Sequence, residues 1–257
     1  MKVDKVENRM HIAVISDVHG NLIALDAVLQ DLRREQIDQI VALGDMIQSG
    51  PQHAEVVQRL REMNCPVVMG NSDSWLLTGA ETGSEPLSEE RLRKLHAVRE
   101  WSLARLTKAD RAYIESFTPT IHLDLTHGHK FLGFHGSPTD FDQLIFPHTP
   151  QGEFRSLLMP YADHILAGGH VHLPFVRRIA DSLFFNPGSV GVAYDHEQDE
   201  AAFRLDRWAE YAILTVDEGR LRLEFRRVSF DVTELVRVYR DSGRPFAEEV
   251  ISQYGGA

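Results

Sequence analysis

The stretch HIAVISDVHGN, at residues 11–21, decides the fold of this chain. Residues 11–16 form an apolar run that predicts a buried strand, and Asp17 and His19 follow directly at its end. From residue 21 to about residue 34, leucines and valines then recur at helical spacing. A strand that leads through polar side chains into a helix is typical of α/β sheets, which bind ligands outside the carboxyl ends of their strands.

The same arrangement recurs along the first part of the chain. Further strands are predicted at 39–43 and 66–69, with a helix over 52–63 between them. This β-α-β-α-β order implies parallel strands joined by right-handed crossovers.

The second half of the chain has a different pattern. We expect strands there at 120–125, 130–134, 165–167 and 183–185, then a hairpin of 211–216 and 221–228 around Asp217-Glu218-Gly219, and a last helix over 232–241. The predicted fold class is therefore α/β, in four layers: a two-sheet β-sandwich flanked by helices.

Residues 74–119 lack a strand pattern and are helical and charged. Thr107 to Asp110 predicts a capping box that opens a short helix, and Glu81 to Pro86 predicts an exposed loop. We expect one domain over residues 1–257, with 74–119 as a helical, lid-like insertion.

The composition limits the classes of function. A hydrophobic fraction of 43% supports a sizeable core, and no uncharged apolar stretch is long enough to cross a membrane. The charged first residues lack the apolar core of a signal peptide, and the single cysteine, Cys65, cannot form an internal disulfide. We therefore expect a cytoplasmic protein in which Cys65 is a small buried hydrophobe. The net charge of −11 argues against bulk binding to nucleic acid, but it does not exclude a small phosphorylated substrate.

Seven side chains suited to metal binding follow five apolar runs. They are Asp17, His19, Asp45, Asn71, His135, His170 and His172. Oxygen and imidazole ligands without a thiolate suit Mn, Fe, Zn, Ni or Co. Seven ligands suit two divalent metals better than one, and Asp45, alone at the end of a middle strand, is the natural bridge between them.

These motifs carry a resemblance to a known family. They are Asp17-Val18-His19-Gly20-Asn21, Gly44-Asp45, Gly70-Asn71-Ser72-Asp73, His135-Gly136 and Gly169-His170-Val171-His172. In these motifs and in their order the chain, from Met10 onward, resembles the calcineurin-like metallophosphoesterases. The resemblance implies a β-sandwich flanked by helices and a pair of divalent metal ions, with manganese favoured.

The resemblance also implies a role for each ligand. Asp17, His19, Asp45 and His172 would bind the first metal. Asn71, His135 and His170 would complete the second, with Asp45 shared. Asp45, Asn71 and His135 are the candidate catalytic residues, and Asn71 would also touch the phosphoryl oxygen.

One position departs from the family's pattern. Ser72 stands where the family usually has a histidine that is thought to protonate the leaving group, and serine is no general acid near neutral pH. The loop from Gly44 to Pro51 also lacks the Asp-Arg-Gly of the protein serine/threonine phosphatases. Small phosphodiesterases of the family likewise lack the histidine.

We therefore expect a phosphodiesterase in which a hydroxide bridging the two metals attacks phosphorus. The alternatives are a phosphomonoesterase, a nucleotide or dinucleoside polyphosphate hydrolase, and a non-catalytic scaffold of the same fold. A scaffold should have lost metal ligands, whereas none of the seven is missing here. The sequence leaves open the physiological substrate, the native metal and the oligomeric state.

Several other residues allow both a functional and a purely structural interpretation. Asp73 could orient an imidazole, hold a water or simply cap a helix, and Tyr194 or His196 could lend the substrate a hydrogen bond or a proton. For the remaining residues we prefer a structural role over a functional one. These roles are a turn for His127 and His129, a surface helix start for His53, a helix cap for Asn21, and core or lid packing for Trp75, Phe141 and Phe146.

Overall fold

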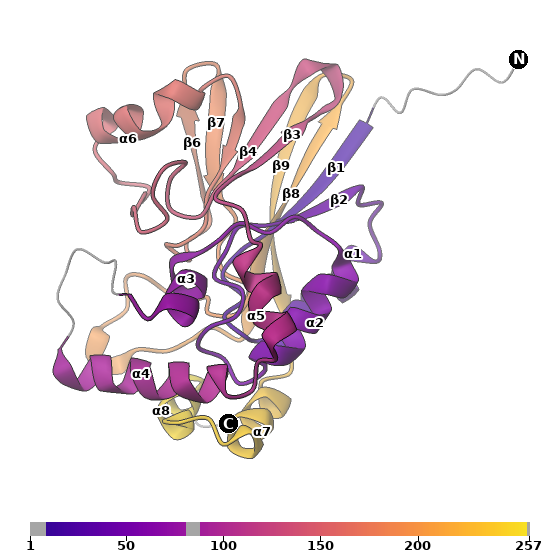
Figure 1. Cartoon of the computed structure of the whole chain (residues 1–257). Helices are drawn as coiled ribbons and strands as arrows, with labels where there is room; N and C mark the ends of the chain where they lie inside the picture. The colour runs from indigo at the N-terminus through magenta and orange to yellow at the C-terminus, as the bar shows by residue number, and fades with distance from the viewer. Residues whose placement is uncertain (1–8, 81–87, 256–257) are drawn as a thin grey trace, which may run out of the picture.

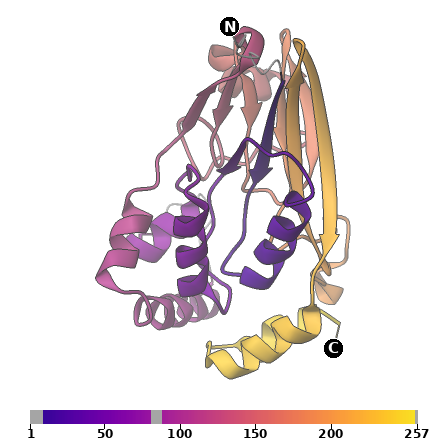
Figure 2. The ribbon, with the colours of Figure 1, turned by 90° about the vertical axis from the view of Figure 1, so that its right-hand side faces the viewer.

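The computed structural model describes residues 9–80 and 88–255 of the chain. In these residues two β-sheets pack face to face, and helices lie outside both (Figure 1). Figure 2 shows the sandwich from the side, with the long last strand leading down to the C-terminal helices. The predicted two-sheet sandwich is confirmed. The predicted loop at 81–86 lies outside the described residues.

The first sheet has the strand order β2-β1-β8-β9. Its strands are β1 (Arg9–Ile15), β2 (Gln39–Ala42), β8 (Trp208–Asp217) and β9 (Arg220–Ser229). β1 pairs in parallel with β2, as the crossover pattern predicts, and antiparallel with β8. Glu218 and Gly219 both have positive φ, which suits the tight turn of the predicted β8–β9 hairpin.

The second sheet has the strand order β3-β4-β5-β7-β6. Its strands are β3 (Ile121–Asp124), β4 (Lys130–Gly133), β5 (Ile165–Ala167), β6 (Phe175–Ile179) and β7 (Ser182–Asn186). The sequence patterns missed β6, in which the adjacent Arg177 and Arg178 interrupt the apolar run. One of them, Arg177, lays its guanidinium over the ring of Phe154 at 3.8 Å from the centroid.

Eight α-helices lie in the described residues. They are α1 (Leu22–Leu32), α2 (His53–Met63), α3 (Asn71–Thr78), α4 (Glu89–Leu103), α5 (Lys108–Glu115), α6 (Gln151–Leu158), α7 (Val232–Ser242) and α8 (Ala247–Gln253). The predicted capping box of Thr107 and Asp110 opens α5. Asn21 caps α1 as predicted, since its Oδ1 accepts a hydrogen bond from the Ala24 amide at 3.0 Å. α6 and α8 were not predicted. None of these helices is both long and apolar enough to span a bilayer.

Four apolar cores lie among the described residues, and two of them support the loops at the strand ends. Buried side chains such as Val14, Phe131 and Phe185 fill the space between the sheets. Ile15, Leu25 and other apolar residues of β1, α1, α2 and α5 form a second core on the outer face of the first sheet. The sheets and the helix layer therefore form a rigid base for the loops at the strand ends.

Two sequence predictions are wrong in detail. Residues 66–69 form no strand: they make single parallel bridges from Val67 to Ala42 and from Val68 to Thr118, because the chain turns at once into α3. Cys65 is half-buried rather than buried, since it lies at the edge of the core on the first sheet.

Candidate metal centre

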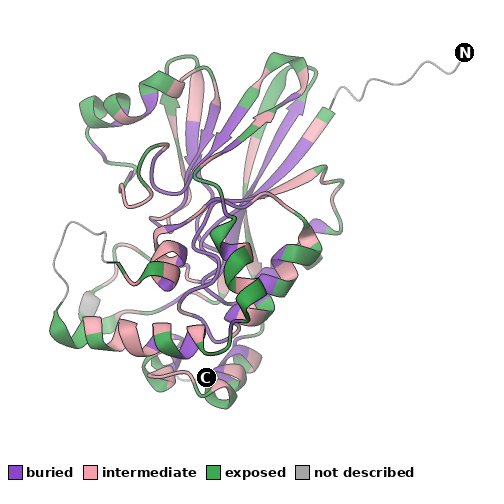
Figure 3. Cartoon of the chain, viewed as in Figure 1, coloured by how far each residue is buried: buried purple, intermediate pink, exposed green. Residues whose placement is uncertain are grey.

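The seven predicted ligands lie where the loops after β1, β2, β4 and β5 meet the first turn of α3 (Figure 1). These loops run through the middle of the molecule and are largely buried (Figure 3). Asp17, Asp45 and His135 are each at most 2% exposed. A buried convergence of charged and imidazole groups is costly unless the groups pair or bind a metal.

The acidic and imidazole groups form two clusters. Asp17, His19 and His172 make the first, and within it the potential ligand atoms all lie within 4.8 Å of one another. The second cluster has the same compactness and is made by Asp45, His135 and His170. The structure thus brings the seven predicted residues together in two groups, with Asn71 beside the second.

Asn71 and Asp45 connect the two clusters to each other and to α3. The Asn71 Oδ1 lies 3.0 Å from His135 Nε2. Asp45 Oδ1 lies 3.5 Å from His135 Nε2, whereas Asp45 Oδ2 lies 3.7 Å from His19 Nε2. Each oxygen of Asp45 therefore faces a different cluster, which is the geometry that a bridging carboxylate needs.

Three of the four imidazoles are held so that Nε2 faces the centre. Each places its Nδ1 against a backbone carbonyl oxygen: His19 at Gln48 (3.1 Å), His135 at Leu43 (2.8 Å) and His172 at Val192 (2.9 Å). A carbonyl oxygen only accepts, so Nδ1 carries the proton and donates it. In the neutral ring, Nε2 then has a free lone pair, as metal-binding histidines require.

The backbone at these positions is strained. Five of the seven residues have φ in the left-handed region: Asp17 (55°), His19 (48°), Asp45 (54°), His170 (72°) and His172 (52°). Each such residue costs roughly 1 kcal/mol, and strain of this kind gathers at functional sites. Main-chain hydrogen bonds from Asp17 N to Gly44 O and from His19 N to Asp45 O keep the two strand-end loops together.

The carboxylate of Asp17 fits a cation. Its Oδ2 accepts a hydrogen bond from the His170 amide at 3.1 Å. Its Oδ1 is buried and has no hydrogen-bond donor in the described part of the chain, although it lies 3.2 Å from His172 Nε2. Burial acts to raise the pKa of Asp17, but the nearby His172 and His135 outweigh it and lower that pKa.

The titration behaviour of the second cluster is similar. Burial acts against ionisation of Asp45, yet His135, His19 and His170 lower its pKa well below the ordinary value. Burial acts to lower the pKa of His135, but Asp45 and Asp17 raise it to about 9. The carboxylates and the His135 imidazole thus stabilise one another's charged forms. Because the donors are carboxylate, amide and imidazole groups without thiolate, they suit divalent metal ions.

The first turn of α3 holds the loop after β2. The fully buried carboxylate of Asp73 accepts hydrogen bonds from the amides of Met46 (3.1 Å) and Ile47 (3.0 Å), and also caps α3. Burial and the neighbouring Asp45 raise the pKa of Asp73 to about 7. The cap reading is thus confirmed, and no hydrogen bond joins Asp73 to a described imidazole.

The loop after β7 supports Asp17 through polar side chains that were not among the predicted site residues. Ser189 Oγ donates to Asp17 O at 2.8 Å and accepts from the Val192 amide at 2.9 Å. Asn186 Nδ2 donates to Gly169 O at 2.6 Å. Both side chains are fully buried. The Asn186-Pro187-Gly188-Ser189 stretch at a strand end was the pattern that could have revealed them.

The remaining candidates divide between the centre and the rest of the molecule. Tyr194 lies beside the first cluster, with its ring centroid 6.0 Å from that of His172, and His196 stacks on Tyr194 at 4.2 Å. His127 and His129 lie at the β3–β4 connection, away from the clusters, as predicted. Trp75, on α3, is half-buried and packs beside α4 residues such as His96. Phe141 and Phe146 are also half-buried, in the loop that follows His135.

The prediction that His53 lies on the surface is wrong. It opens α2 as expected, but it is 1% exposed rather than on the surface. Its ring lies 4.7 Å from that of Trp101, and its Nε2 donates to Ser102 O at 3.1 Å. Both partners belong to α4, so the insertion buries a helix start that would otherwise face water.

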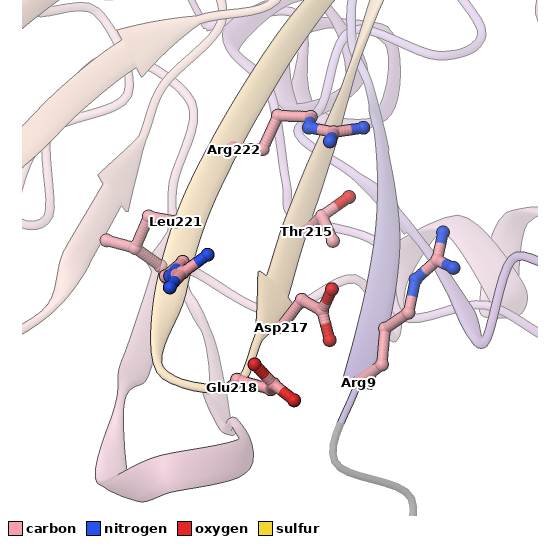
Figure 4. Close-up of a pocket in the computed structure, with 7 residues that line it drawn as sticks. Arg9, Thr215, Asp217, Glu218, Leu221 and Arg222 are labelled. Carbon is pink, nitrogen blue, oxygen red and sulfur yellow. The ribbon is translucent and has the colours of Figure 1, made fainter.

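A separate pocket lies at the opposite end of the first sheet from the candidate metal centre. It is lined by Arg9, Thr215, Asp217, Glu218, Arg220, Leu221 and Arg222 (Figure 4). Arg9 begins β1, whereas Asp17 follows the end of β1, so the length of the strand separates this pocket from the candidate metal centre.

Comparison with known proteins agrees with the geometry. A family model described as the calcineurin-like phosphoesterase superfamily domain matches residues 10–218. An uncharacterized protein of Methanocaldococcus jannaschii is 30% identical in an alignment of 239 residues that covers 86% of this chain and 88% of that protein. Phosphodiesterase YfcE of Escherichia coli K12 is 26% identical in an alignment of 193 residues that covers 71% of this chain and 80% of YfcE.

Solved structures show the same fold. A metallophosphoesterase from Sphaerobacter thermophilus superposes with a TM-score of 0.70 at 26% identity, over 95% of this chain and 98% of that one. A hypothetical protein from Pyrococcus horikoshii gives a TM-score of 0.75 at 21% identity, over 96% and 100% of the two chains.

Proposed function

This chain belongs to the calcineurin-like phosphoesterase superfamily, and from that premise we propose that it is a metal-dependent phosphodiesterase with a two-metal centre. The observation that carries the proposal is the position of Asp45, whose two carboxylate oxygens face separate ligand clusters. A single-metal site has no use for such a carboxylate, whereas a pair of metals about 3.5–4 Å apart requires one.

The side chains divide between the two ions. Asp17, His19 and His172 would hold the first and Asn71, His135 and His170 the second, with Asp45 between them. Divalent ions bound there would act as Lewis acids on the phosphoryl oxygens and lower the pKa of a coordinated water towards about 7. Manganese suits these donors, as do iron, zinc, nickel and cobalt.

The chain itself supplies orientation. Backbone carbonyls fix three imidazoles, so their Nε2 atoms need no reorganisation when a phosphoryl group binds. The amide of Asn71 lies within 3.0 Å of His135, and we assign its NH₂ group to hydrogen bonding with a phosphoryl oxygen. Burial of the centre strengthens each of these electrostatic interactions.

A diester is favoured over a monoester for two reasons. The loop from Gly44 to Pro51 has no arginine to hold the second negative charge of a monoester. Among the relatives, YfcE is named a phosphodiesterase. Phosphomonoesters, nucleotides and dinucleoside polyphosphates remain the competing substrates, and a non-catalytic scaffold is the competing role.

Hydrolysis of two chromogenic esters tests the proposal. Purified protein is stripped of metal and assayed with bis-p-nitrophenyl phosphate and with p-nitrophenyl phosphate, with and without Mn²⁺. We expect Mn²⁺-dependent turnover with a higher kcat/KM for the diester. A preference for the monoester would make the protein a phosphatase, and a protein that binds no metal and cleaves neither ester would be a scaffold.

A further inference from the structure

We infer that Ser72 is a positioning residue for Asp45, and that the site cleaves phosphoesters whose leaving group departs as an anion, without a proton from the protein. The substrate class is thus phosphoanhydrides and esters of acidic hydroxyls such as phenols, rather than esters of simple alcohols. The inference rests on the proposed phosphodiesterase function and narrows its substrates.

Both hydrogen-bond donors of Ser72 point at a single carboxylate. Its backbone N–H donates to Asp45 Oδ1 at 2.8 Å, and its Oγ–H donates to Asp45 Oδ2 at 2.7 Å. The two oxygens that face the two ligand clusters are therefore each held by one donor of the same residue. A carboxylate held at both oxygens keeps one orientation, which is what a bridging ligand needs.

The surroundings of Ser72 press α3 against the Asp45 loop. Gly70 passes so close that a Cβ built on it would lie 2.1 Å from Asp45 Oδ1. Asp73 ties the amides of Met46 and Ile47 to the same helix turn. The free amides at a helix start also favour a negative charge beside them. Ser72 thus belongs to a group of residues that fix the position of the Asp45 carboxylate.

In this arrangement the hydroxyl proton of Ser72 is already donated in a hydrogen bond to the Asp45 carboxylate. A serine hydroxyl is also far too weak an acid to release this proton near neutral pH. Ser72 occupies the place at which relatives with a histidine would offer a proton, so this place supplies none here.

Two other groups near the centre could offer a proton. Tyr194 is half-buried beside His172, and a phenol, with an ordinary pKa of about 10, is a poor acid at neutral pH. His196 stacks behind Tyr194 with its Nε2 3.4 Å from His172 O. The His196 Nε2 is therefore engaged with the backbone of His172.

The reaction then balances without an acid. A water oxygen forms a bond to phosphorus, the bond from phosphorus to the leaving oxygen breaks, and the electron pair stays on that oxygen. The water loses its proton to solvent. The rate of this step follows the stability of the leaving anion, because nothing neutralises its developing charge except the charges already at the site.

A leaving-group series tests this directly. Phosphodiesters with one constant ester group are prepared with leaving phenols of graded pKa and with methanol, and kcat/KM is measured on the Mn²⁺-loaded protein. We expect a steep decline with leaving-group pKa, and methanol esters slower by at least about 100-fold, the lower limit of what a general acid supplies. A flat series with rapid turnover would overturn this inference alone. No turnover even of the most acidic leaving group would overturn the proposed function together with it.

Three variants separate positioning from proton donation. Ser72→Ala should weaken Mn²⁺ binding, measured by calorimetry, by about 10- to 100-fold, the usual effect of removing a residue that orients a ligand. Ser72→Thr keeps the hydroxyl and should restore most of that affinity. Ser156→Ala, on the exposed face of α6, is the matched control and should bind Mn²⁺ as the unaltered protein does.

The slope of log kcat/KM against leaving-group pKa further distinguishes a positioning role from proton donation. In Ser72→Ala and in Tyr194→Phe, we expect the slope to remain unchanged, because neither residue gives a proton to the leaving group. A slope that steepens in Ser72→Ala while Mn²⁺ affinity stays unchanged would make Ser72 the acid. A slope that steepens in Tyr194→Phe would give that role to Tyr194. Either result would overturn the inference.

Discussion

Replacement of Gly70 by alanine tests whether the contact between α3 and the Asp45 loop is as tight as the structure has it. A Cβ at position 70 would lie 2.1 Å from Asp45 Oδ1 and 2.2 Å from Asp45 N. Protein Cβ atoms essentially never come within 3.0 Å of another heavy atom, so the two segments must separate by about 0.9 Å. Neither neighbour can swing away, because one is backbone and the other is the side chain of a residue that is 2% exposed.

The size of the effect follows from that displacement. Overfilling a packed interior costs about 1–3 kcal/mol, which for a domain of this size lowers Tm by about 2–12 °C. The hydrogen bonds from Ser72 to Asp45, now 2.8 and 2.7 Å, would lengthen beyond the normal range. We therefore expect Gly70→Ala to lower both Tm and Mn²⁺ affinity, the latter by about 10- to 100-fold.

Thermal unfolding and calorimetric Mn²⁺ titration measure the two effects. The matched control is Gly152→Ala, because Gly152 lies in α6 and a Cβ there would meet no atom within 4 Å. Alanine suits a helix interior better than glycine, so this variant should be as stable as the unaltered protein or up to about 1 kcal/mol more stable. A Gly70→Ala protein with unaltered Tm and Mn²⁺ affinity would refute the reasoning.

Three further predictions concern charge and burial. Asp45→Asn removes the shared carboxylate, so turnover of bis-p-nitrophenyl phosphate should vanish while circular dichroism remains unchanged; residual Mn²⁺-dependent turnover near the original rate would contradict this. Burial lowers the pKa of His53 from 6.5 to about 4, so the unfolded chain takes up a proton before the folded one as pH falls. Stability should therefore decline between pH 6.5 and 4, by roughly 3 kcal/mol more than in His53→Gln, as measured by urea unfolding; equal pH profiles would disprove it. Burial raises the pKa of the Cys65 thiol to about 11, so its reaction with a disulfide reagent at pH 8 should be far slower in the folded protein than in urea, and equal rates would show an accessible thiolate.

The sequence patterns located the strands that carry ligands because those strands are buried and uniformly apolar. β1 and β2 and the β8–β9 hairpin were predicted within a few residues. β6 was missed because the adjacent Arg177 and Arg178 interrupt the apolar pattern, and the guanidinium of Arg177 packs on the ring of Phe154. Residues 66–69 look like a strand for the opposite reason: they are apolar because they are buried, yet they make only single bridges.

The positions of the ligands were predictable, whereas their supports were not. Six of the seven ligands follow a strand end, and Asn71 begins α3. In α/β folds, ligands bind outside the carboxyl ends of the strands. The groups that orient them are backbone carbonyls of Leu43, Gln48 and Val192, which no residue pattern reveals. His53 shows the same limit, since its burial depends on α4, some fifty residues further along the chain. Long-range packing decides such contacts, and local sequence does not encode it.

The structure shows how the helical insertion at residues 74–119 packs against the rest of the protein. α5 packs on α2 and α3, and Ile114 and Phe117 join the core on the first sheet. Arg99 of α4 donates from Nε and Nη2 to the carbonyls of Trp75, Leu76 and Leu77 at the end of α3. The insertion thus braces the helix whose first turn carries Asn71 and Ser72. Its action as a lid over the substrate stays a prediction.

Anomalous X-ray diffraction from crystals grown with Mn²⁺ tests the central claim most directly. We expect two manganese peaks about 3.5–4 Å apart. One should lie among Asp17, His19 and His172, the other among Asn71, His135 and His170, with a carboxylate oxygen of Asp45 on each. A single peak, or two peaks with Asp45 bound to only one of them, would contradict the two-metal centre on which the proposed function depends.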